Sequence, residues 1–220
     1  MTIDEMMRLA PVIPVLVLED GVDPVALAEA LVDGGLPVIE VTLRTPNALA
    51  AMRTMAKVEG AIVGAGTVID EATLGAAIDA GARFIVSPGL TDPLARAAIA
   101  SGVPFLPGIA TASDIMRGLD HGLERFKFFP AEAAGGLPAL KALAGPFGAI
   151  RFCPTGGIRA DTAPAWLAHP SVLCVGGSWI LPAGETDMAA VRARARNAAS
   201  LGHGDCWKFP IDALTISPIS

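Results

Sequence analysis

One lysine of this 220-residue chain stands in a chemical setting unlike that of the others. Lys127 lies inside a strand-like aromatic run, Phe126 to Phe129. The remaining lysines fall where solvent is expected: Lys57, Lys141 and Lys208. Burial among aromatic rings disfavours the charged ammonium, and the neutral amine is the form that attacks a carbonyl carbon. Lys127 is therefore a candidate nucleophile that forms a Schiff base with a carbonyl substrate.

A second candidate is Glu40, the one acidic residue in the interior of a predicted strand. Its strand alternates, with Ile39, Val41 and Leu43 in the apolar register and Glu40, Thr42 and Arg44 in the polar one. A buried carboxylate without a partner is costly, so Glu40 either pairs with a cation or serves proton transfer. Structural pairing with Arg44 or Lys127 is the alternative to an acid/base role.

The elements that would position these residues recur about every 21 residues. A glycine closes successive helix-like segments, at Gly35, Gly60, Gly81, Gly102, Gly122 and Gly145. A β-rich run follows each glycine, and the predicted strands are Val12–Leu18, Val38–Leu43, Ala61–Thr67, Phe84–Ser87, Phe105–Ala110, Arg125–Phe129, Ile150–Thr155 and Val172–Gly176. Helix starts are predicted at Asp23-Pro24 and Thr45-Pro46, and residues 2–5 read as a capping box for an extra N-terminal helix.

This repetition predicts an α/β protein whose leading architecture is a single (β/α)8 TIM barrel, with an extra N-terminal helix and a C-terminal extension. A doubly wound open sheet is the alternative. No linker-like tract divides the chain, so one domain is expected over residues 1–220. Strand residues in a barrel alternate between lumen and helix layer. Lys127 shares a register with Arg125 and Phe129, and we expect it to point into the same lumen as Glu40.

Glycine pairs follow the seventh and eighth predicted strands, in Thr155-Gly156-Gly157 and in Gly176-Gly177-Ser178. Backbone N–H groups at glycine can approach an anion closely, and these two loops form the usual phosphate site of such barrels. A phosphorylated ligand is therefore expected. The glycines of Gly64 to Thr67 lack the longer dinucleotide pattern, which sets a dinucleotide-binding reading aside.

Composition limits the binding partners and the cellular compartment that can be expected. The net charge is −6 with few basic clusters, which argues against nucleic acid and against anionic lipid. The apolar runs are too short to span a bilayer and the N-terminus is acidic, so a cytoplasmic protein is expected. The odd set of cysteines reads as reduced core thiols, and the scattered histidines offer no metal site. These residues are Cys153, Cys174, Cys206, His121, His169 and His203.

Several segments together resemble the 2-keto-3-deoxy-6-phosphogluconate (KDPG) aldolases, also called 4-hydroxy-2-oxoglutarate aldolases. They are Glu40–Arg44, Gly64–Thr67, Ser87–Gly89, Phe126–Glu132 and Arg151–Gly157. The resemblance covers roughly residues 10 to 200. It implies a class I aldolase without metal or other cofactor, on a trimeric barrel, cleaving KDPG to pyruvate and glyceraldehyde 3-phosphate in the Entner–Doudoroff pathway. Cleavage of 4-hydroxy-2-oxoglutarate to pyruvate and glyoxylate is implied as a second activity.

The same resemblance assigns roles to individual residues. Lys127 would be the Schiff-base lysine and Glu40 the acid/base. Two residues would hold the pyruvate carboxylate and two would line the pocket: respectively Arg44 and Thr67, and Pro88 and Phe129. Thr155 would contact a substrate hydroxyl. The phosphate would lie against Gly156, Gly157, Gly177 and Ser178.

Other functions remain open from the residues alone. An isomerase or epimerase of phosphosugars would share the phosphate loops, but it would not need a desolvated lysine. A metal-dependent aldolase would need clustered ligands, and a non-enzymatic phosphosugar-binding module would bind without turnover. Relatives that act on the galactonate epimer carry an arginine late in the first strand, where this chain has Val17. That difference favours the gluconate substrate.

The roles of three further features depend on where they lie in the fold. The tail 202–220 alternates apolar and polar residues and is predicted to pack on the barrel or on a neighbouring subunit. Glu132, just past the sixth strand, orients its loop or meets solvent, and a catalytic role is the remaining alternative. The arginines of the last helix, Arg192, Arg194 and Arg196, are predicted to form a solvated face.

Overall fold

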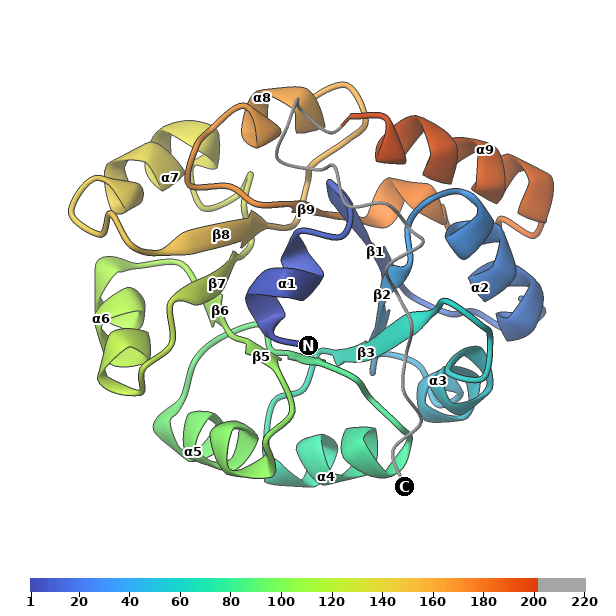
Figure 1. Ribbon diagram of the computed structural model, residues 1–220, viewed down its shortest axis with the longest axis horizontal. Helices are drawn as coiled ribbons and strands as arrows, with labels where there is room; N and C mark the ends of the chain where they lie inside the picture. Colours follow the sequence, from blue (N-terminus) through green and yellow to red (C-terminus); the bar gives the residue numbers. More distant parts are fainter. Residues whose placement is uncertain (202–220) are drawn as a thin grey trace.

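α-Helices surround a curled set of parallel strands in the computed structural model, which describes residues 1–201 (Figure 1). The strands are β1 (Val12–Leu16), β2 (Val38–Thr42), β3 (Ile62–Gly66), β4 (Ile85–Val86), β5 (Phe105–Leu106), β6 (Gly108–Ile109), β7 (Arg125–Phe128), β8 (Arg151–Pro154) and β9 (Val175–Gly177). The helices are α1 (Ile3–Met7), α2 (Pro24–Asp33), α3 (Ala48–Met55), α4 (Glu71–Asp79), α5 (Asp92–Ser101), α6 (Ala112–Asp120), α7 (Gly136–Ala144), α8 (Ala163–Leu167) and α9 (Met188–Ala199), with a short 3-10 helix η1 (Ser178–Ile180).

All pairings between these strands are parallel, and they form two sheets. One sheet has the order β5-β4-β3-β2-β1-β9 and the other the order β6-β7-β8. Pro107 alone separates β5 from β6, and a bridge between Thr155 and Gly176 links the end of β8 to β9. The two sheets thus follow one another around a central axis with helices on the outside, as Figure 1 shows. The α/β alternation predicted from the sequence is confirmed.

The predicted strands all appear, with shorter bounds in most cases. The fifth, predicted over residues 105–110, is split at Pro107 because proline has no N–H to donate to a neighbouring strand. Helix α2 begins as expected, since the Asp23 carboxylate accepts hydrogen bonds from the N–H groups of Val25 and Ala26. The capping box at Thr2 is also present.

The predicted helix start at Thr45-Pro46 is wrong. Helix α3 begins later, at Ala48, after Asn47, which makes no side-chain cap. The Thr45 hydroxyl is buried without a hydrogen-bond partner in residues 1–201, while its backbone carbonyl accepts from the N–H of Ala48. The turn after β2 therefore takes more residues than the sequence pattern allowed for.

Glycine ends most of the helices in the way the period suggested. Five of the six glycines have positive φ, a conformation that closes a helix at little cost only for glycine: Gly35, Gly60, Gly81, Gly102 and Gly122. Gly145 differs, because it caps α7 with a φ of −52°. The glycine spacing therefore marked the helix ends correctly, but the sixth glycine, Gly145, ends its helix without a positive φ.

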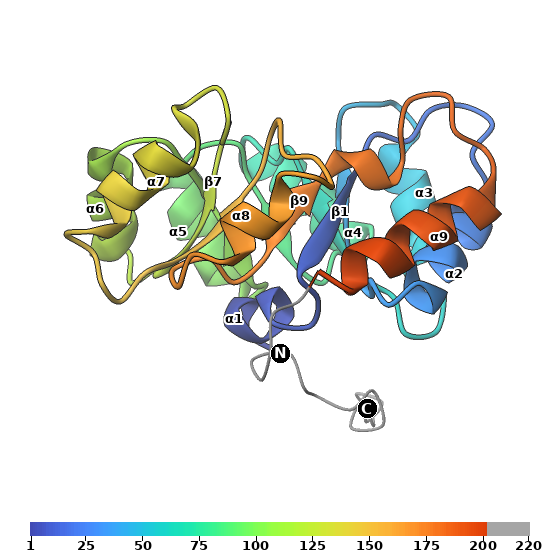
Figure 2. The same ribbon diagram turned by 90° about the horizontal axis from the view of Figure 1, so that it is seen from above.

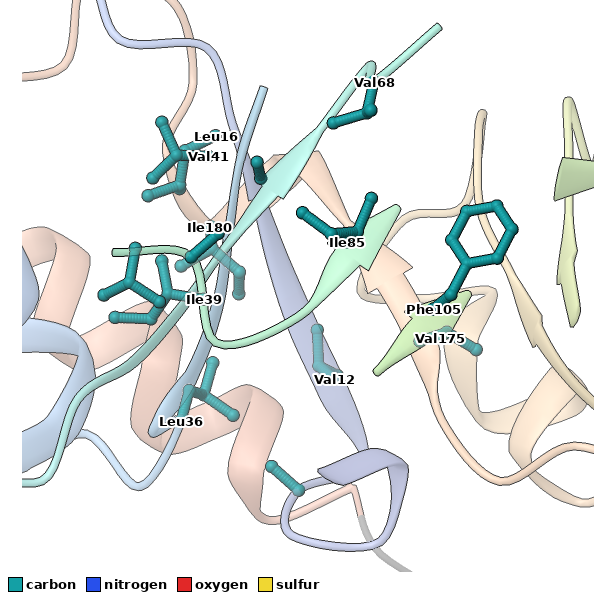
Figure 3. Close-up of a cluster of buried hydrophobic side chains, with 14 of the residues drawn as sticks. Val12, Leu16, Leu36, Ile39, Val41, Val68, Ile85, Phe105, Val175 and Ile180 are labelled. Carbon is teal, nitrogen blue, oxygen red and sulfur yellow. The ribbon is translucent and has the colours of Figure 1, made fainter. Parts of the chain in front are cut away.

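The larger hydrophobic cluster lies between the strands and the helices. Residues on the outer face of the strands, such as Val12, Ile39 and Val175, meet apolar side chains of the surrounding helices (Figure 3). Phe126 and Phe128 of β7 are fully buried in this cluster. The register predicted for β7, with these two rings facing the helices, is confirmed.

A second cluster fills the lumen near the amino ends of the strands. Met6 and Met7 of α1 pack against the lumen residues Ile13, Val38, Ile62, Phe84, Val86, Leu106, Cys153, Leu173 and Cys174. Figure 2 shows α1 covering that end of the strands. Cys153 and Cys174 are free and buried, as predicted. Burial raises the pKa of the Cys174 thiol well above its ordinary value, and its hydrogen bond with Cys153 adds to the rise. The lumen is therefore closed and apolar below the level of Lys127.

No helix in residues 1–201 is long and apolar enough to cross a membrane. The predicted packing of the tail 202–220, with His203 and Cys206 in it, lies outside the described residues.

Helix α1 is tied to the strands by an ion-pair network at Asp4. The Asp4 carboxylate accepts hydrogen bonds from the guanidinium of Arg8, at 2.7 Å, and from that of Arg125 at the start of β7. Burial alone would raise the pKa of Asp4, but the hydrogen bonds from Arg8 and Arg125 outweigh it and hold the pKa below its usual value. A carboxyl with a depressed folded-state pKa stabilises the fold above its unfolded pKa, and this contribution is lost as the pH falls through the folded-state value.

We expect Asp4→Asn to lower the free energy of unfolding by about 1 kcal/mol at neutral pH, because both arginines lose a charged acceptor. The deficit relative to the unsubstituted protein should shrink as the pH falls below about 4, because Asp4 of the unfolded chain is then protonated while the folded state, with its lowered pKa, must still take up the proton. Urea unfolding measured from pH 3 to pH 7 checks this. A deficit that stays constant over that range would contradict the role assigned to the Asp4 charge.

Candidate active site

Lys127 of β7 and Glu40 of β2 meet inside the lumen. The Lys127 Nζ donates to Oε1 of Glu40 at 2.9 Å and to Oε2 at 3.2 Å. The side chains are 6% and 4% exposed, so this ion pair is almost fully removed from water. The convergence of the two residues expected from strand alternation is present, across 87 residues of sequence.

Strand alternation places both groups, and a glycine gives them room. On β2 the neighbours Ile39 and Val41 lie in the outer cluster, which leaves Glu40 facing the lumen. Gly66, at the end of β3, lies beside the carboxylate: a Cβ on Gly66 would overlap Oε1 of Glu40. The absence of a side chain at Gly66 is therefore a condition for the observed position of the Glu40 carboxylate.

An aromatic ring and a proline turn lie at the carboxyl ends of the strands. The half-buried ring of Phe129 has its centroid 5.4 Å from the Lys127 Nζ, within reach of a cation–π interaction. Pro88 follows β4 and is exposed, while the hydroxyl of the preceding Ser87 is buried and donates to the Gly89 carbonyl at 2.7 Å. The structure thus brings Phe129 close to the lysine, and it places Pro88 in a loop at the carboxyl end of its strand.

Arg44 lies elsewhere than the strand register predicted. Strand β2 ends at Thr42, so Arg44 falls in the following turn, where it is exposed and makes no hydrogen bond or ion pair within residues 1–201. The prediction that Arg44 continues the inner register of β2 is wrong, because the strand stops two residues earlier. The guanidinium is nevertheless attached just past the carboxyl end of the strand that carries Glu40.

Thr67 has an unusual backbone. It directly follows β3, and its φ of 61° is the one positive value at a non-glycine residue in the described chain. This conformation is strained for a β-branched residue, and such strain persists only where the surroundings impose it. Thr67 is thereby fixed at the carboxyl ends of the strands, next to Gly66 and the Glu40 carboxylate.

The two glycine loops are adjacent. Thr155 is buried and forms the bridge to Gly176, which joins the loop after β8 to β9 and η1. Gly156 and Gly157 have φ values of 103° and 80°, and Gly177 leads into η1, whose first residue, Ser178, is exposed. The bridge therefore brings the glycine-containing backbone of the two loops together at the carboxyl ends of β8 and β9.

Two side chains near these loops make contacts that the sequence did not predict. Arg194 of α9 is not simply solvated, because it donates to the carbonyl of Ile180 at 2.9 Å and to Glu185 at 2.8 Å, so it braces the end of η1. Glu132 accepts a hydrogen bond from the indole N–H of Trp166 at 3.1 Å. No sequence motif marks Arg194, whose contacts come from a loop that the helical pattern does not reveal.

The two described histidines lie away from this pocket. His121, at the end of α6, lies 3.2 Å from Asp92 of α5. At His169 burial lowers the pKa of the imidazole, and the positive charge of Lys141 lowers it further. Within residues 1–201, no three histidine, cysteine or acidic side chains cluster closely enough to hold a metal ion.

Comparison with known proteins gives a consistent family. The family model of the KDPG and KHG aldolases matches residues 3–194. The KHG/KDPG aldolase of Escherichia coli K12 is 52% identical over 181 residues, which cover 82% of this chain and 85% of that protein.

Solved structures agree with this match. The crystal structure of 2-keto-3-deoxy-6-phosphogluconate aldolase from Zymomonas mobilis ATCC 29191 superposes with a TM-score of 0.90 at 57% identity, covering 91% of this chain and 98% of that one. The KDPG aldolase of Legionella pneumophila, with pyruvate captured at low pH as a covalent carbinolamine intermediate, superposes with a TM-score of 0.80 at 43% identity. That match covers 93% of this chain and 96% of the other.

The buried pair makes a prediction about stability. Lys127→Met leaves the Glu40 carboxylate buried without its partner, and we expect the free energy of unfolding to fall by about 3 kcal/mol. The double variant Lys127→Met/Glu40→Gln should be less unstable than the sum of the single variants, with a coupling of at least about 1 kcal/mol. Urea unfolding of the four proteins measures this, and the exposed Lys57→Met is the matched control. Strict additivity would mean that the two side chains do not interact.

Proposed function

The chain belongs to the KDPG and KHG aldolase family, and we propose that it is a class I aldolase that cleaves 2-keto-3-deoxy-6-phosphogluconate to pyruvate and glyceraldehyde 3-phosphate. Cleavage of 4-hydroxy-2-oxoglutarate to pyruvate and glyoxylate is proposed as its second reaction. The observation that carries the proposal is the buried contact between the Lys127 amine and the Glu40 carboxylate at 2.9 Å. The contact supports the proposal because it holds an amine and a carboxylate together above the apolar side chains that fill the amino end of the lumen.

Lys127 is proposed as the nucleophile. Glu40 accepts a proton from the Lys127 ammonium, and the neutral amine adds to C2 of the keto acid to give a carbinolamine. Glu40 returns this proton to the C2 hydroxyl, which leaves as water, so an iminium forms between the Lys127 nitrogen and C2 and Glu40 is again a carboxylate. A carbinolamine of pyruvate, as in the Legionella enzyme, is what an amine forms when it adds to a ketone. The iminium is a far better electron sink than the ketone, which is why a lysine is needed at this position.

Glu40 is proposed as the acid and base of the cleavage. Removal of the proton from the C4 hydroxyl lets the C3–C4 bond break, and its electron pair moves into the iminium to give an enamine. Glyceraldehyde 3-phosphate leaves with the new carbonyl at C4. Proton return to C3 and hydrolysis of the resulting iminium release pyruvate and the free Lys127 amine. A single carboxylate serves both proton transfers because both occur within reach of the same lumen position.

The loops are proposed to bind the two ends of the substrate. Arg44 and Thr67, beside the strands that carry Glu40 and Gly66, hold the keto-acid carboxylate, for which a guanidinium offers two parallel hydrogen bonds. The exposed and unpaired guanidinium of Arg44 is free to do this in the described chain. Phe129 and Pro88 line the pocket, and Thr155 contacts a hydroxyl. The backbone at Gly156, Gly157 and Gly177, with Ser178, holds the phosphate. Anchoring both ends orients the scissile bond.

The architecture proposed for this site is a closed (β/α)8 barrel formed by one domain. The continuity of β5 and β6 across Pro107 and the bridge between Thr155 and Gly176 support closure of the two sheets into one ring. The proposed mechanism needs neither a metal ion nor an organic cofactor, since the iminium supplies the electron sink. We further propose a homotrimer and a cytoplasmic location, as the family resemblance implies.

The choice of epimer is the finer part of the proposal. Val17 follows β1 and is partly exposed at the carboxyl end of the strand, where an apolar side chain offers no donor to a hydroxyl or a phosphate. We propose the gluconate compound as the preferred substrate, with the galactonate epimer as the alternative. The ratio of kcat/KM for the two epimers decides between them.

Reductive trapping tests the nucleophile. Incubation with pyruvate and borohydride should convert the iminium to a stable secondary amine on Lys127, found by mass spectrometry of the digested protein. The exposed lysines Lys57 and Lys141 serve as internal controls and should stay unmodified. A digest without an adduct on Lys127 would remove the basis of the class I mechanism.

A Glu40→Gln substitution tests the acid/base role. The amide has nearly the same shape and can still accept a hydrogen bond from Lys127, but it cannot carry a proton. KDPG cleavage should fall by about 10²-fold to 10⁴-fold, while pyruvate trapping on Lys127 persists at longer incubation. Unchanged turnover in this variant would assign the proton transfers to another group.

A further inference from the structure

The backbone of the loop after β8 is held from one side by the loop after β7. The N–H of Ala131 donates to the carbonyl of Thr155 at 2.8 Å, and the N–H of Glu132 donates to the carbonyl of Gly156 at 3.1 Å. The N–H of Gly157 donates to no acceptor within residues 1–201. The carbonyl groups of Thr155 and Gly156 therefore accept hydrogen bonds from the loop after β7, while the N–H of Gly157 is left for a ligand.

The side chain of Glu132 is anchored by a buried indole. Its Oε1 accepts from Nε1 of Trp166 at 3.1 Å, and Trp166 itself is 2% exposed. The Trp166 ring packs against Phe128 of β7, with the ring centroids 6.3 Å apart. Because Phe128 directly follows Lys127, the anchor of the Glu132 carboxylate rests on the strand that carries the lysine.

The loop lies directly on the stem of Glu132. A Cβ on Gly157 would come within 2.7 Å of the Cβ of Glu132, closer than two carbon atoms approach in real structures. The φ of Gly157 is 80°, so this position requires glycine for its backbone conformation as well. The Gly157 backbone thus lies against the Glu132 stem, and a side chain at position 157 would collide with it.

The charge of Glu132 is opposite to what an anion ligand would need. A carboxylate next to a phosphate would repel it, unless nearby donors hold and neutralise the carboxylate. The Trp166 N–H is one such donor. The positively charged Arg159 also interacts with Glu132: its pKa is raised mainly by the hydrogen bond to Asp161, and the charge of Glu132 adds to that rise. Geometry, rather than charge, explains why this side chain stands at the loop.

We propose that Glu132 and Trp166 are positioning residues, which fix the Gly156-Gly157 backbone so that its N–H groups receive the substrate phosphate. This inference rests on the proposed function, because it concerns the phosphate end of that same substrate. Neither residue touches the reacting carbon atoms. The pair therefore acts on affinity for the phosphorylated substrate and leaves the chemistry at Lys127 unchanged.

The test compares substrates with and without phosphate. In Glu132→Ala we expect the KM for KDPG and the inhibition constant of inorganic phosphate to rise about tenfold, the effect of losing a hydrogen bond to a charged group. The kcat should stay within about twofold, and so should kcat/KM for 2-keto-3-deoxygluconate, which lacks the phosphate. Trp166→Phe keeps an aromatic ring but loses the N–H, and it should raise both constants by about threefold.

Two controls separate positioning from general damage. Glu132→Gln retains an oxygen that accepts from Trp166, so it should stay within about twofold of the unsubstituted protein. Glu59→Ala makes the same charge change at an exposed turn before β3 and should change nothing. If Glu132→Ala does not fold, as judged by its melting curve, the phosphate inhibition constant of Trp166→Phe decides the question.

The outcomes are distinct. Equal losses with both substrates, or an unchanged inhibition constant for phosphate, would overturn the positioning role. A protein that forms no pyruvate adduct on Lys127 would instead refute the proposed function. A protein that forms the adduct and cleaves KDPG, yet is insensitive to Glu132→Ala, would refute the inference alone.

Discussion

The contact between the Lys127 amine and the Glu40 carboxylate sets the conditions for the rest of the structure. Two ionisable side chains that are 6% and 4% exposed have lost almost all hydration, and their mutual attraction offsets that cost only in close geometry. The distances of 2.9 and 3.2 Å meet this condition. Keeping the geometry requires β2 and β7 to hold their registers, and it requires Gly66 to leave space for the carboxylate.

The lumen is organised as two levels around that contact. Below it, apolar side chains and the two methionines of α1 exclude water, and the Asp4 network ties α1 to the start of β7. Above it, the loops carry polar backbone, a strained Thr67, and Arg44, which forms no ion pair within residues 1–201. Closure at one end and polarity at the other leave the carboxyl ends of the strands as the accessible face, which is the end at which parallel α/β sheets bind their ligands.

Much of this arrangement was predictable, because the signals are periodic. Period-2 alternation fixed which face of β2 and β7 holds Glu40 and Lys127, since one slip in register would have put both groups against the helices. The recurring glycines located the helix ends. Where the signal was a short motif the prediction failed: Thr45-Pro46 resembles a helix start, but the turn after β2 runs on to Asn47. Arg44 was misplaced for the same reason, since alternation alone does not say where a strand stops.

The loop contacts were beyond the sequence for a different physical reason. Arg194 reaches Ile180, and Trp166 reaches Glu132, across loops whose course depends on packing rather than on local preference. Such pairs join distant positions without any periodic pattern, so no window of sequence contains both partners. On charge alone, a carboxylate beside an expected phosphate site would argue against phosphate binding there. The close approach of Gly157 to the Glu132 stem appears only in the folded chain, because it depends on how the loops after β7 and β8 pack together.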